Sequence, residues 1–282
     1  MRADEGYVDF RGYRTWYRIV GELQGGAVPL LALHGGPGST HNYFQPLERL
    51  ADGRAVVVYD QIGCGKSDRP TDIEWNVDVF REEVTAVREQ LQLERIHLLG
   101  TSWGGMLALE HVLAGATGII SLILSSTLAN IDDWAQEQRR LLQEMGLKPV
   151  SAEDPDHERT EQLYFDHHFY RGPKPRAELE RMFAEHNLDV YRAMQGPDEW
   201  TVTGALCGWD VRDRLGEIDV PTLVIRGRYD MSTEKIAATL IDGIRNADAA
   251  VLEHSSHTPV LEETEAYLAT VEEFMRAHEH GS

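Results

Sequence analysis

Residues 96–113, which read IHLLGTSWGGMLALEHVL, join an apolar run, a glycine-flanked serine and a helical pattern without a gap. The run at 96–99 predicts a short buried strand, and the pattern from residue 106 onward predicts a helix. Between them, GTSWG at 100–104 fits the motif G-x-S-x-G. A sharp strand-to-helix turn leaves no room for neighbouring β-carbons, so small residues flank its central residue. The stretch therefore predicts a nucleophile elbow with Ser102 at its tip; the alternative is a structural turn with an incidental serine.

Short apolar runs like the one at 96–99 recur along the chain, and helical patterns separate most of them. Runs that are apolar at consecutive positions are typical of strands buried on both faces of a parallel sheet. Their alternation with helices predicts an α/β fold with a doubly wound, mostly parallel sheet. Two alternating stretches near the N-terminus, at 7–10 and 14–20, predict two antiparallel edge strands. The apolar runs lie at 30–33, 55–59, 119–124, 222–225 and 249–252, and the helical patterns at 77–91, 106–113 and 236–244.

The alternation of strand and helix breaks between about residues 126 and 204. Only helical patterns occur there, and this segment holds sixteen acidic residues against nine lysines and arginines. We therefore expect an α/β core formed by residues 1–125 and 205–282, with a helical lid, or cap, at 126–204 inserted after the sixth strand. The helical patterns of the lid lie at 134–145, 158–169 and 176–186.

The composition narrows the classes of partner and compartment. A hydrophobic content of 42% is ample for a core, and the net charge of −20 argues against nucleic acid or an anionic membrane as a partner. Two cysteines far apart, Cys64 and Cys207, form no disulfide framework and fit a reducing compartment. The sequence shows neither an apolar signal segment nor an apolar run long enough to span a bilayer. We expect a soluble cytoplasmic protein. The sequence gives no indication of its oligomeric state.

A serine hydroxyl is a weak nucleophile, so it needs a histidine to take its proton and an acid to orient that histidine. In this topology the acid follows the serine in the chain and the histidine comes last. Asp230 follows the apolar run at 222–225, at the carboxyl edge of the sheet where such sites form. Asp219 precedes that run and so lies at the wrong edge, and Asp210 and Asp213 come earlier still. Asp230 is therefore the predicted acid.

Two histidines follow the last apolar run and compete for the role of general base. His254 lies close to the predicted end of the strand, whereas His257 lies deeper in the following loop and is free to reach across the site. The histidine should come last in the chain order and lie in a loop at the carboxyl edge of the sheet, and these two rules favour His257.

Acyl transfer also needs two N–H donors for the oxyanion. One is expected from Trp103, the residue after the nucleophile, and the other from the loop after the strand at 30–33. That loop reads HGGPG at 34–38, and its glycines allow bare backbone to approach a substrate oxygen. We assign Gly36 as the second donor, with Gly35 as the alternative.

Two other patterns resemble cofactor sites but lack required residues. GCGKS at 63–67 ends like a phosphate-binding loop, yet Asp60 occupies the position of the first required glycine. The pairs His254-x-x-His257 and His167-His168 have no third ligand at a recognisable spacing. The sequence therefore predicts neither a nucleotide cofactor nor a metal.

Taken together, these motifs resemble the proline iminopeptidase-type branch of the α/β-hydrolases. The resemblance covers nearly the whole chain and implies a serine hydrolase that releases an N-terminal amino acid, often proline, from short peptides or amides. It is carried by HGGPG at 34–38, DQIGCGKS at 60–67, GTSWGG at 100–105, VYRAMQGPDEW at 190–200, GWDVRD at 208–213, GRYD at 227–230 and SSH at 255–257. It implies Ser102, Asp230 and His257 as the triad, and Gly36 and Trp103 as the oxyanion donors.

The same resemblance implies a binding site for the free α-amine of the substrate. Glu199, in GPDEW, matches one of the acids that hold this ammonium group in the family. The family's second acid directly follows the triad aspartate, but this chain has Met231 there. A methionine makes the pocket more apolar and weakens its hold on a cation.

The leading prediction is a serine aminopeptidase or amino-acid amidase that forms an acyl-enzyme on Ser102. Met231 favours an alternative: an esterase, lactonase or amidase for an apolar substrate without a free α-amine. A third possibility, a non-catalytic binding protein on the same scaffold, would not need all three triad residues. A small molecule or short peptide is the expected substrate in the first two cases.

Overall fold

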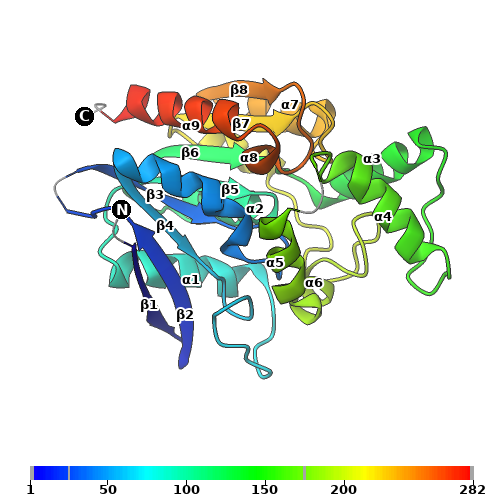
Figure 1. The fold of residues 1–282 in the computed structure, drawn as a ribbon, viewed down its shortest axis with the longest axis horizontal. Helices are drawn as coiled ribbons and strands as arrows, with labels where there is room; N and C mark the ends of the chain where they lie inside the picture. Colours follow the sequence, from blue (N-terminus) through cyan, green and yellow to red (C-terminus); the bar gives the residue numbers. More distant parts are fainter. Residues whose placement is uncertain (1–2, 25, 174–175, 280–282) are drawn as a thin grey trace.

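An eight-stranded sheet organises the computed structural model, which describes residues 3–24, 26–173 and 176–279 (Figure 1). Its strands lie in the order β1-β2-β4-β3-β5-β6-β7-β8; β2 pairs antiparallel with β1 and β4, and all other neighbours are parallel. The predicted mostly parallel α/β fold is therefore confirmed. The strands are β1 (Ala3–Phe10), β2 (Tyr13–Val20), β3 (Ala27–Leu33), β4 (Arg54–Tyr59), β5 (Ile96–Thr101), β6 (Ile119–Ser125), β7 (Thr222–Gly227) and β8 (Ala247–Leu252).

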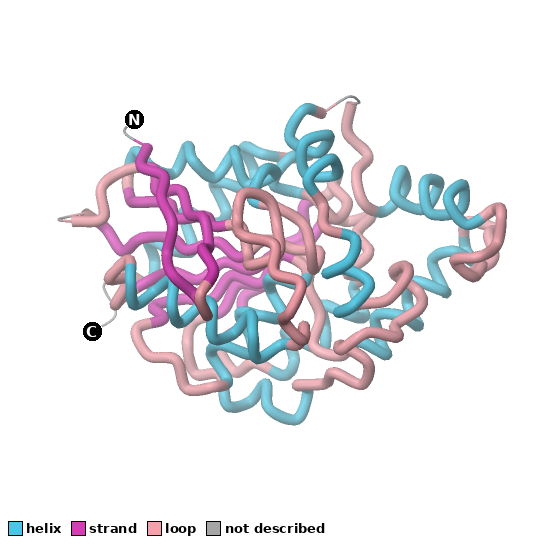
Figure 2. Tube along the Cα trace, turned by 90° about the horizontal axis from the view of Figure 1, so that it is seen from below, coloured by secondary structure: helices cyan, strands magenta, loops and turns pink. Residues whose placement is uncertain are grey.

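Helices cover both faces of the sheet because its central strands are apolar on both sides. In β3, Leu31 and Leu33 join the core under one layer of helices, while Leu30 and Ala32 join the core under the other. Figure 2 shows helices on both sides of the twisted strands. One layer contains α1 (Val77–Gln90), α2 (Trp103–Leu113) and α7 (Glu234–Gly243), and the other contains the 3₁₀ segment η1 (His41–Asp52), α8 (Pro259–Glu262) and α9 (Thr264–His278).

Two expectations about the margins of the sheet were wrong. β2 is not an edge strand, because it lies between β1 and β4 and pairs with both. β8 is the opposite edge, so it has only β7 as a neighbour, and Asp248 and Ala249 are exposed. An apolar run at consecutive positions therefore did not mean burial on both faces here.

Four helices come between β6 and β7: α3 (Ile131–Glu144), α4 (His157–His168), α5 (Ala177–Glu185) and α6 (Leu188–Met194). They form the lobe at the right of Figure 1, beyond the carboxyl ends of the parallel strands. The described residues of this segment form no strand beyond isolated bridges, and the short 3₁₀ segment η2 (Arg212–Glu217) leads back to β7. None of the helices in the described ranges combines the length and the apolar character needed to cross a membrane.

One buried carboxyl ties α1 to the loop after β4. Glu83 is fully buried, accepts a hydrogen bond from the backbone N–H of Ile62 at 2.7 Å, and is bonded by the hydroxyl of Thr15. Burial raises the pKa of Glu83 to about 8, Asp60 adds to the rise, and the two hydrogen bonds oppose it. Glu83 is therefore largely protonated in the folded protein at neutral pH.

Because the folded protein holds this proton up to about pH 8 and the unfolded chain loses it near pH 4.5, Glu83 should contribute less stability as the pH rises. The difference in unfolding free energy between the wild type and Glu83→Gln should therefore change with pH. We expect the wild type to lose about a few kcal/mol relative to the variant between pH 4.5 and 8, the size that follows from the pKa difference of Glu83 between the unfolded and folded states. Urea unfolding of both proteins across this range measures the difference. Parallel curves would contradict the prediction.

Candidate active site

Ser102 lies at the tip of the turn between β5 and α2. Its backbone has φ 55° and ψ −121°, a strained conformation for a residue with a side chain. The N–H of Ser102 donates to the carbonyl of Ser125 at 2.9 Å, and the hydroxyl of Thr127 donates to the carbonyl of Ser102 at 2.7 Å. These bonds hold the turn against β6. A β-carbon at Gly100 would collide with the Gly104 backbone, so the motif glycines are a steric requirement.

His257 and Asp230 form a buried hydrogen-bonded pair beside this turn. His257 Nδ1 lies 2.7 Å from Asp230 Oδ1, and both side chains are almost completely shielded from solvent. The N–H of Ser232 donates to Asp230 Oδ1 at 2.8 Å, and the N–H of Gly227 lies 3.3 Å from Oδ2. These bonds fix the carboxylate, which in turn orients the imidazole. Because Nδ1 is bound to Asp230, Nε2 is the ring nitrogen that can accept a proton.

Two aromatic rings of the helical lobe pack against His257. The rings of Trp134 and Phe169 lie 5.8 and 5.7 Å from the imidazole, measured between centroids. The N–H of His257 donates to the carbonyl of His168 at 3.1 Å, and the hydroxyl of Thr258 donates to the carbonyl of Phe169 at 3.0 Å. The loop that carries the histidine is therefore anchored to the end of α4.

The structure distinguishes the two candidate glycines of the loop after β3. The N–H of Gly35 donates to the hydroxyl of Tyr43 at 2.6 Å, so it is already occupied. Gly36 lines the same cavity as Ser102, has φ 117°, and begins the cis peptide bond to Pro37. A β-carbon at Gly36 would lie 2.6 Å from the nitrogen of Ser39, which explains why this position needs glycine. Trp103, the other predicted donor, begins α2.

Gln61 links the two segments that carry the predicted oxyanion donors. Its side-chain NH₂ donates to the carbonyl of His34 at 2.8 Å, and its Oε1 accepts from Trp103 Nε1 at 2.8 Å. The backbone N–H of Gln61 donates to His34 Nε2 at 2.9 Å, leaving Nδ1 to donate to the carbonyl of Gly35. Burial lowers the pKa of His34 to about 4, so the ring is neutral and can accept at Nε2.

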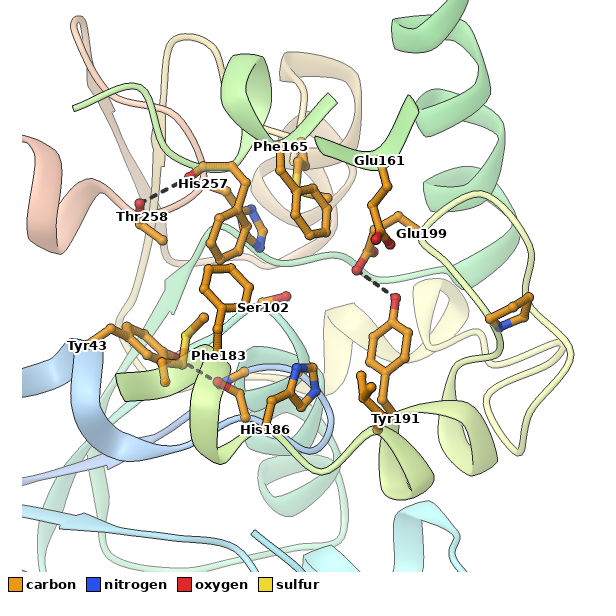
Figure 3. A pocket seen from close by; sticks show the side chains of 18 of the residues that line it. Tyr43, Ser102, Glu161, Phe165, Phe183, His186, Tyr191, Glu199, His257 and Thr258 are labelled. Carbon is orange, nitrogen blue, oxygen red and sulfur yellow. Dashed lines mark hydrogen bonds between the residues drawn. The ribbon is translucent and has the colours of Figure 1, made fainter. Parts of the chain in front are cut away.

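Ser102, His257 and Glu199 all face one cavity of about 510 Å³ between the sheet and the lobe (Figure 3). The carboxylate of Glu199 accepts from the Tyr191 hydroxyl at 2.9 Å and from Trp134 Nε1 at 3.1 Å. Burial raises the pKa of Glu199, while these two donors and His257 oppose the rise. Most of the remaining cavity wall is apolar or aromatic, including Tyr43, Phe165, Phe169, Met182, Phe183 and Met231.

Comparison with known proteins agrees with this architecture. The model of the alpha/beta hydrolase fold family matches residues 28–264. The chain belongs to this family. It is 40% identical to a protein named proline iminopeptidase from Clostridioides difficile, with 99% of this chain and 100% of that protein covered. A proline iminopeptidase from Levilactobacillus brevis is 38% identical over 99% of this chain and 98% of its own.

A solved alpha/beta hydrolase is also similar over its whole length. The crystal structure of a proline iminopeptidase from Mycobacterium smegmatis superimposes with a TM-score of 0.88 at 32% identity, covering 98% of this chain and 99% of that chain. The predicted resemblance to the proline iminopeptidase branch is therefore confirmed.

The structure brings together the residues predicted for the site and separates their competitors. Asp230 contacts His257, whereas His254 is exposed and its N–H donates to Glu263 at 2.8 Å. Asp219 contacts Arg245 at the surface. The described residues contain no group of three or more His, Cys, Asp or Glu placed to hold a metal ion.

Sequence reasoning missed the residues that support the site from a distance in the chain. Trp134 contacts both His257 and Glu199, and Gln61 joins the oxyanion segments, yet neither was singled out. Gln61 and Tyr191 do belong to stretches quoted for the family resemblance, DQIGCGKS and VYRAMQGPDEW. Trp134 had no comparable signal, since it occurs in a helical pattern with no motif around it.

Replacement of Gln61 should affect turnover more than substrate binding. Gln61→Leu removes the two side-chain hydrogen bonds, to the carbonyl of His34 and from Trp103 Nε1, and leaves the backbone bond to His34 Nε2. The predicted oxyanion donors should then lose their alignment while the cavity wall stays intact. We expect kcat to fall about 10- to 100-fold with a smaller change in KM, because oxyanion donors act mainly in the transition state. Ser121→Ala, which removes a buried hydrogen bond to His97 at the opposite ends of the strands, is the matched control and should keep its kcat. An unchanged kcat in Gln61→Leu would contradict this role.

Proposed function

We propose that this alpha/beta hydrolase is a serine peptidase that releases an N-terminal amino acid, proline in particular, from short peptides or amides. The observation that carries the proposal is the position of Glu199, whose carboxylate faces the same cavity as Ser102 and His257. Relatives named proline iminopeptidase, 35–40% identical over at least 96% of this chain, support the same activity.

In the proposed reaction His257 Nε2 takes the proton of Ser102 as its Oγ attacks the carbonyl carbon of the first residue. The N–H groups of Gly36 and Trp103 stabilise the oxyanion. The C–N bond then breaks, and the leaving amine takes the proton from His257, which leaves an acyl-enzyme on Ser102. Water, deprotonated by His257, then attacks the carbonyl carbon of this ester. The bond from that carbon to Ser102 Oγ breaks, Oγ takes the proton back from His257, and the amino acid is released. Asp230 stabilises the imidazolium in both steps.

Glu199 is proposed to bind the protonated α-amine of the substrate. The donors Tyr191 and Trp134 hold one carboxylate oxygen each, which fixes the direction of the group without neutralising it. An ammonium group in the cavity would stabilise the ionised form of Glu199, whose pKa burial raises. Recognition of a free amine at a fixed distance from Ser102 would limit cleavage to the first residue.

One observation favours the alternative activity, which is hydrolysis of an apolar ester, lactone or amide without a free amine. Met231 is buried, lines the cavity and supplies no charge. Glu199 argues against this alternative, since a carboxylate in the cavity is of no use to an uncharged substrate and its burial costs free energy. We therefore favour the peptidase.

We further propose that residues 126–204 act as a lid over an α/β core made of residues 1–125 and 205–282. The net charge of −20 and the free cysteines Cys64 and Cys207 support a cytoplasmic enzyme that acts on small molecules or short peptides and binds neither nucleic acid nor membrane. No cofactor takes part in the proposed chemistry.

Ser102→Ala should abolish turnover of prolyl p-nitroanilide, with a fall in kcat of at least about 10⁴-fold, because it removes the attacking oxygen. The measurement is p-nitroaniline release, with far-ultraviolet circular dichroism as the control for folding. A folded Ser102→Ala variant with substantial activity would exclude the acyl-enzyme route.

Glu199→Gln should reduce the preference for a free amine. The wild type is expected to hydrolyse prolyl p-nitroanilide much faster than its N-acetyl form, because acetylation removes the positive charge. A charged hydrogen bond is worth about 1.5–3 kcal/mol, so kcat/KM for the free amine should fall about 10- to 100-fold in the variant. Glu180→Gln, an exposed position on α5 outside the catalytic cavity, is the control. Equal rates with both substrates in the wild type would instead support the uncharged alternative.

A further inference from the structure

A second carboxylate lies beside Glu199 in the cavity of Ser102. Glu161 belongs to α4, whereas Glu199 belongs to the segment after α6, so the two enter the cavity from different walls. Figure 3 shows both side chains extending into the cavity with their carboxylates close together. Burial raises the pKa of Glu161, the charge of His157 opposes the rise, and the charges of Glu199, Asp198 and Glu158 add to it. Glu158, which precedes Glu161 on α4, also lines the cavity.

Neither carboxylate forms an ion pair with a basic side chain among the described residues. Glu199 receives hydrogen bonds only from the neutral donors Tyr191 and Trp134. Glu161 forms no hydrogen bond or ion pair with any described side chain, and its part in the cavity is therefore unexplained by the fold alone. Two neighbouring carboxylates disfavour each other's ionisation unless a positive charge lies between them.

Four basic side chains line the same cavity: His157, His186, Arg192 and His257. His257 is paired with Asp230, and His186 Nε2 lies 3.2 Å from the carbonyl oxygen of Pro37. His157 Nε2 lies 3.1 Å from Asp198 Oδ2, so this imidazole is already engaged, although its charge lowers the pKa of Glu161. Arg192 is exposed on α6 and forms no ion pair with Glu161 among the described residues. A positively charged ligand is thus the group that would be stabilised by both carboxylates.

We propose that Glu161 is a second binding residue for the α-ammonium group of the substrate and acts opposite Glu199. The proposal rests on the proposed peptidase function and assigns to the lid helix α4 part of the specificity. On the side of the triad, residue 231 is a buried methionine and provides no charge. The second carboxylate therefore comes from the lid and not from the residue after Asp230.

The number of acceptors matches the chemistry of an N-terminal proline. A protonated secondary amine has two N–H bonds, and one carboxylate is available for each, Glu161 on one side and Glu199 on the other. Both N–H bonds of the pyrrolidinium can therefore be directed at a carboxylate.

The test compares wild type, Glu161→Gln, Glu161→Asp and Glu180→Gln on prolyl p-nitroanilide and on p-nitrophenyl acetate. The readout is the ratio of kcat/KM for the cationic substrate to that for the uncharged ester, which cancels general damage to the triad. We expect this ratio to fall about tenfold in Glu161→Gln, to recover in part in Glu161→Asp, and to change less than twofold in Glu180→Gln. A ratio that is unchanged in Glu161→Gln but lowered in Glu199→Gln overturns the role of Glu161 and leaves the proposed function intact.

A second measurement does not depend on turnover. Prolinol carries a pyrrolidinium group and no scissile bond, so its inhibition constant reports on the amine site alone. That constant should rise about tenfold in Glu161→Gln, and an unchanged constant overturns the proposal. If the wild type hydrolyses N-acetylprolyl p-nitroanilide as fast as prolyl p-nitroanilide, the proposed function fails and this inference fails with it.

Discussion

The close passage of α2 over the ends of β3 and β5 is the constraint on which the rest of the site depends. A β-carbon at Gly104 would collide with the backbone of Leu33, and one at Gly100 with the backbone of Gly104. Only glycine allows the helix to begin so near the sheet. The register of β3 and β5 places Leu33 opposite Gly100, which brings the loop of Gly36 to the turn of Ser102. The nucleophile and both proposed oxyanion donors thus follow from one steric condition.

The remaining groups of the site are shared between the core and the helical lobe. Asp230 and His257 follow β7 and β8, so the core alone brings them to the carboxyl edge of the sheet. Trp134 of the lobe contacts two groups of the site, because its ring packs against His257 while its N–H donates to Glu199. The positions of the predicted base and of the proposed amine site are therefore coupled through this side chain.

Local patterns predicted most of the fold and the central residues of the site. The patterns of buried strands and amphipathic helices depend on residues close in the chain, and so does the G-x-S-x-G turn, whose glycines are required by local steric contacts. These features can therefore be predicted from the sequence. The edge position of β8 was not, because burial of a strand depends on its partners in the sheet. Glu161 was likewise not predicted, since its approach to Glu199 depends on how α4 packs against a segment more than thirty residues away. Sequence spacing carries no information about such a contact.

The attachment of the catalytic loop to α4 uses main-chain acceptors. The N–H of His257 and the hydroxyl of Thr258 bind the carbonyls of residues 168 and 169. Every amino acid has a carbonyl, so substitutions at these two positions leave the acceptors in place as long as the helix ends where it does. These two bonds therefore constrain where α4 ends and not which side chains it carries there, although the ring of Phe169 packs against His257 for a separate reason. Insertions or deletions in this helix, and exchange of the lobe between relatives, would displace the histidine even when every motif residue is retained.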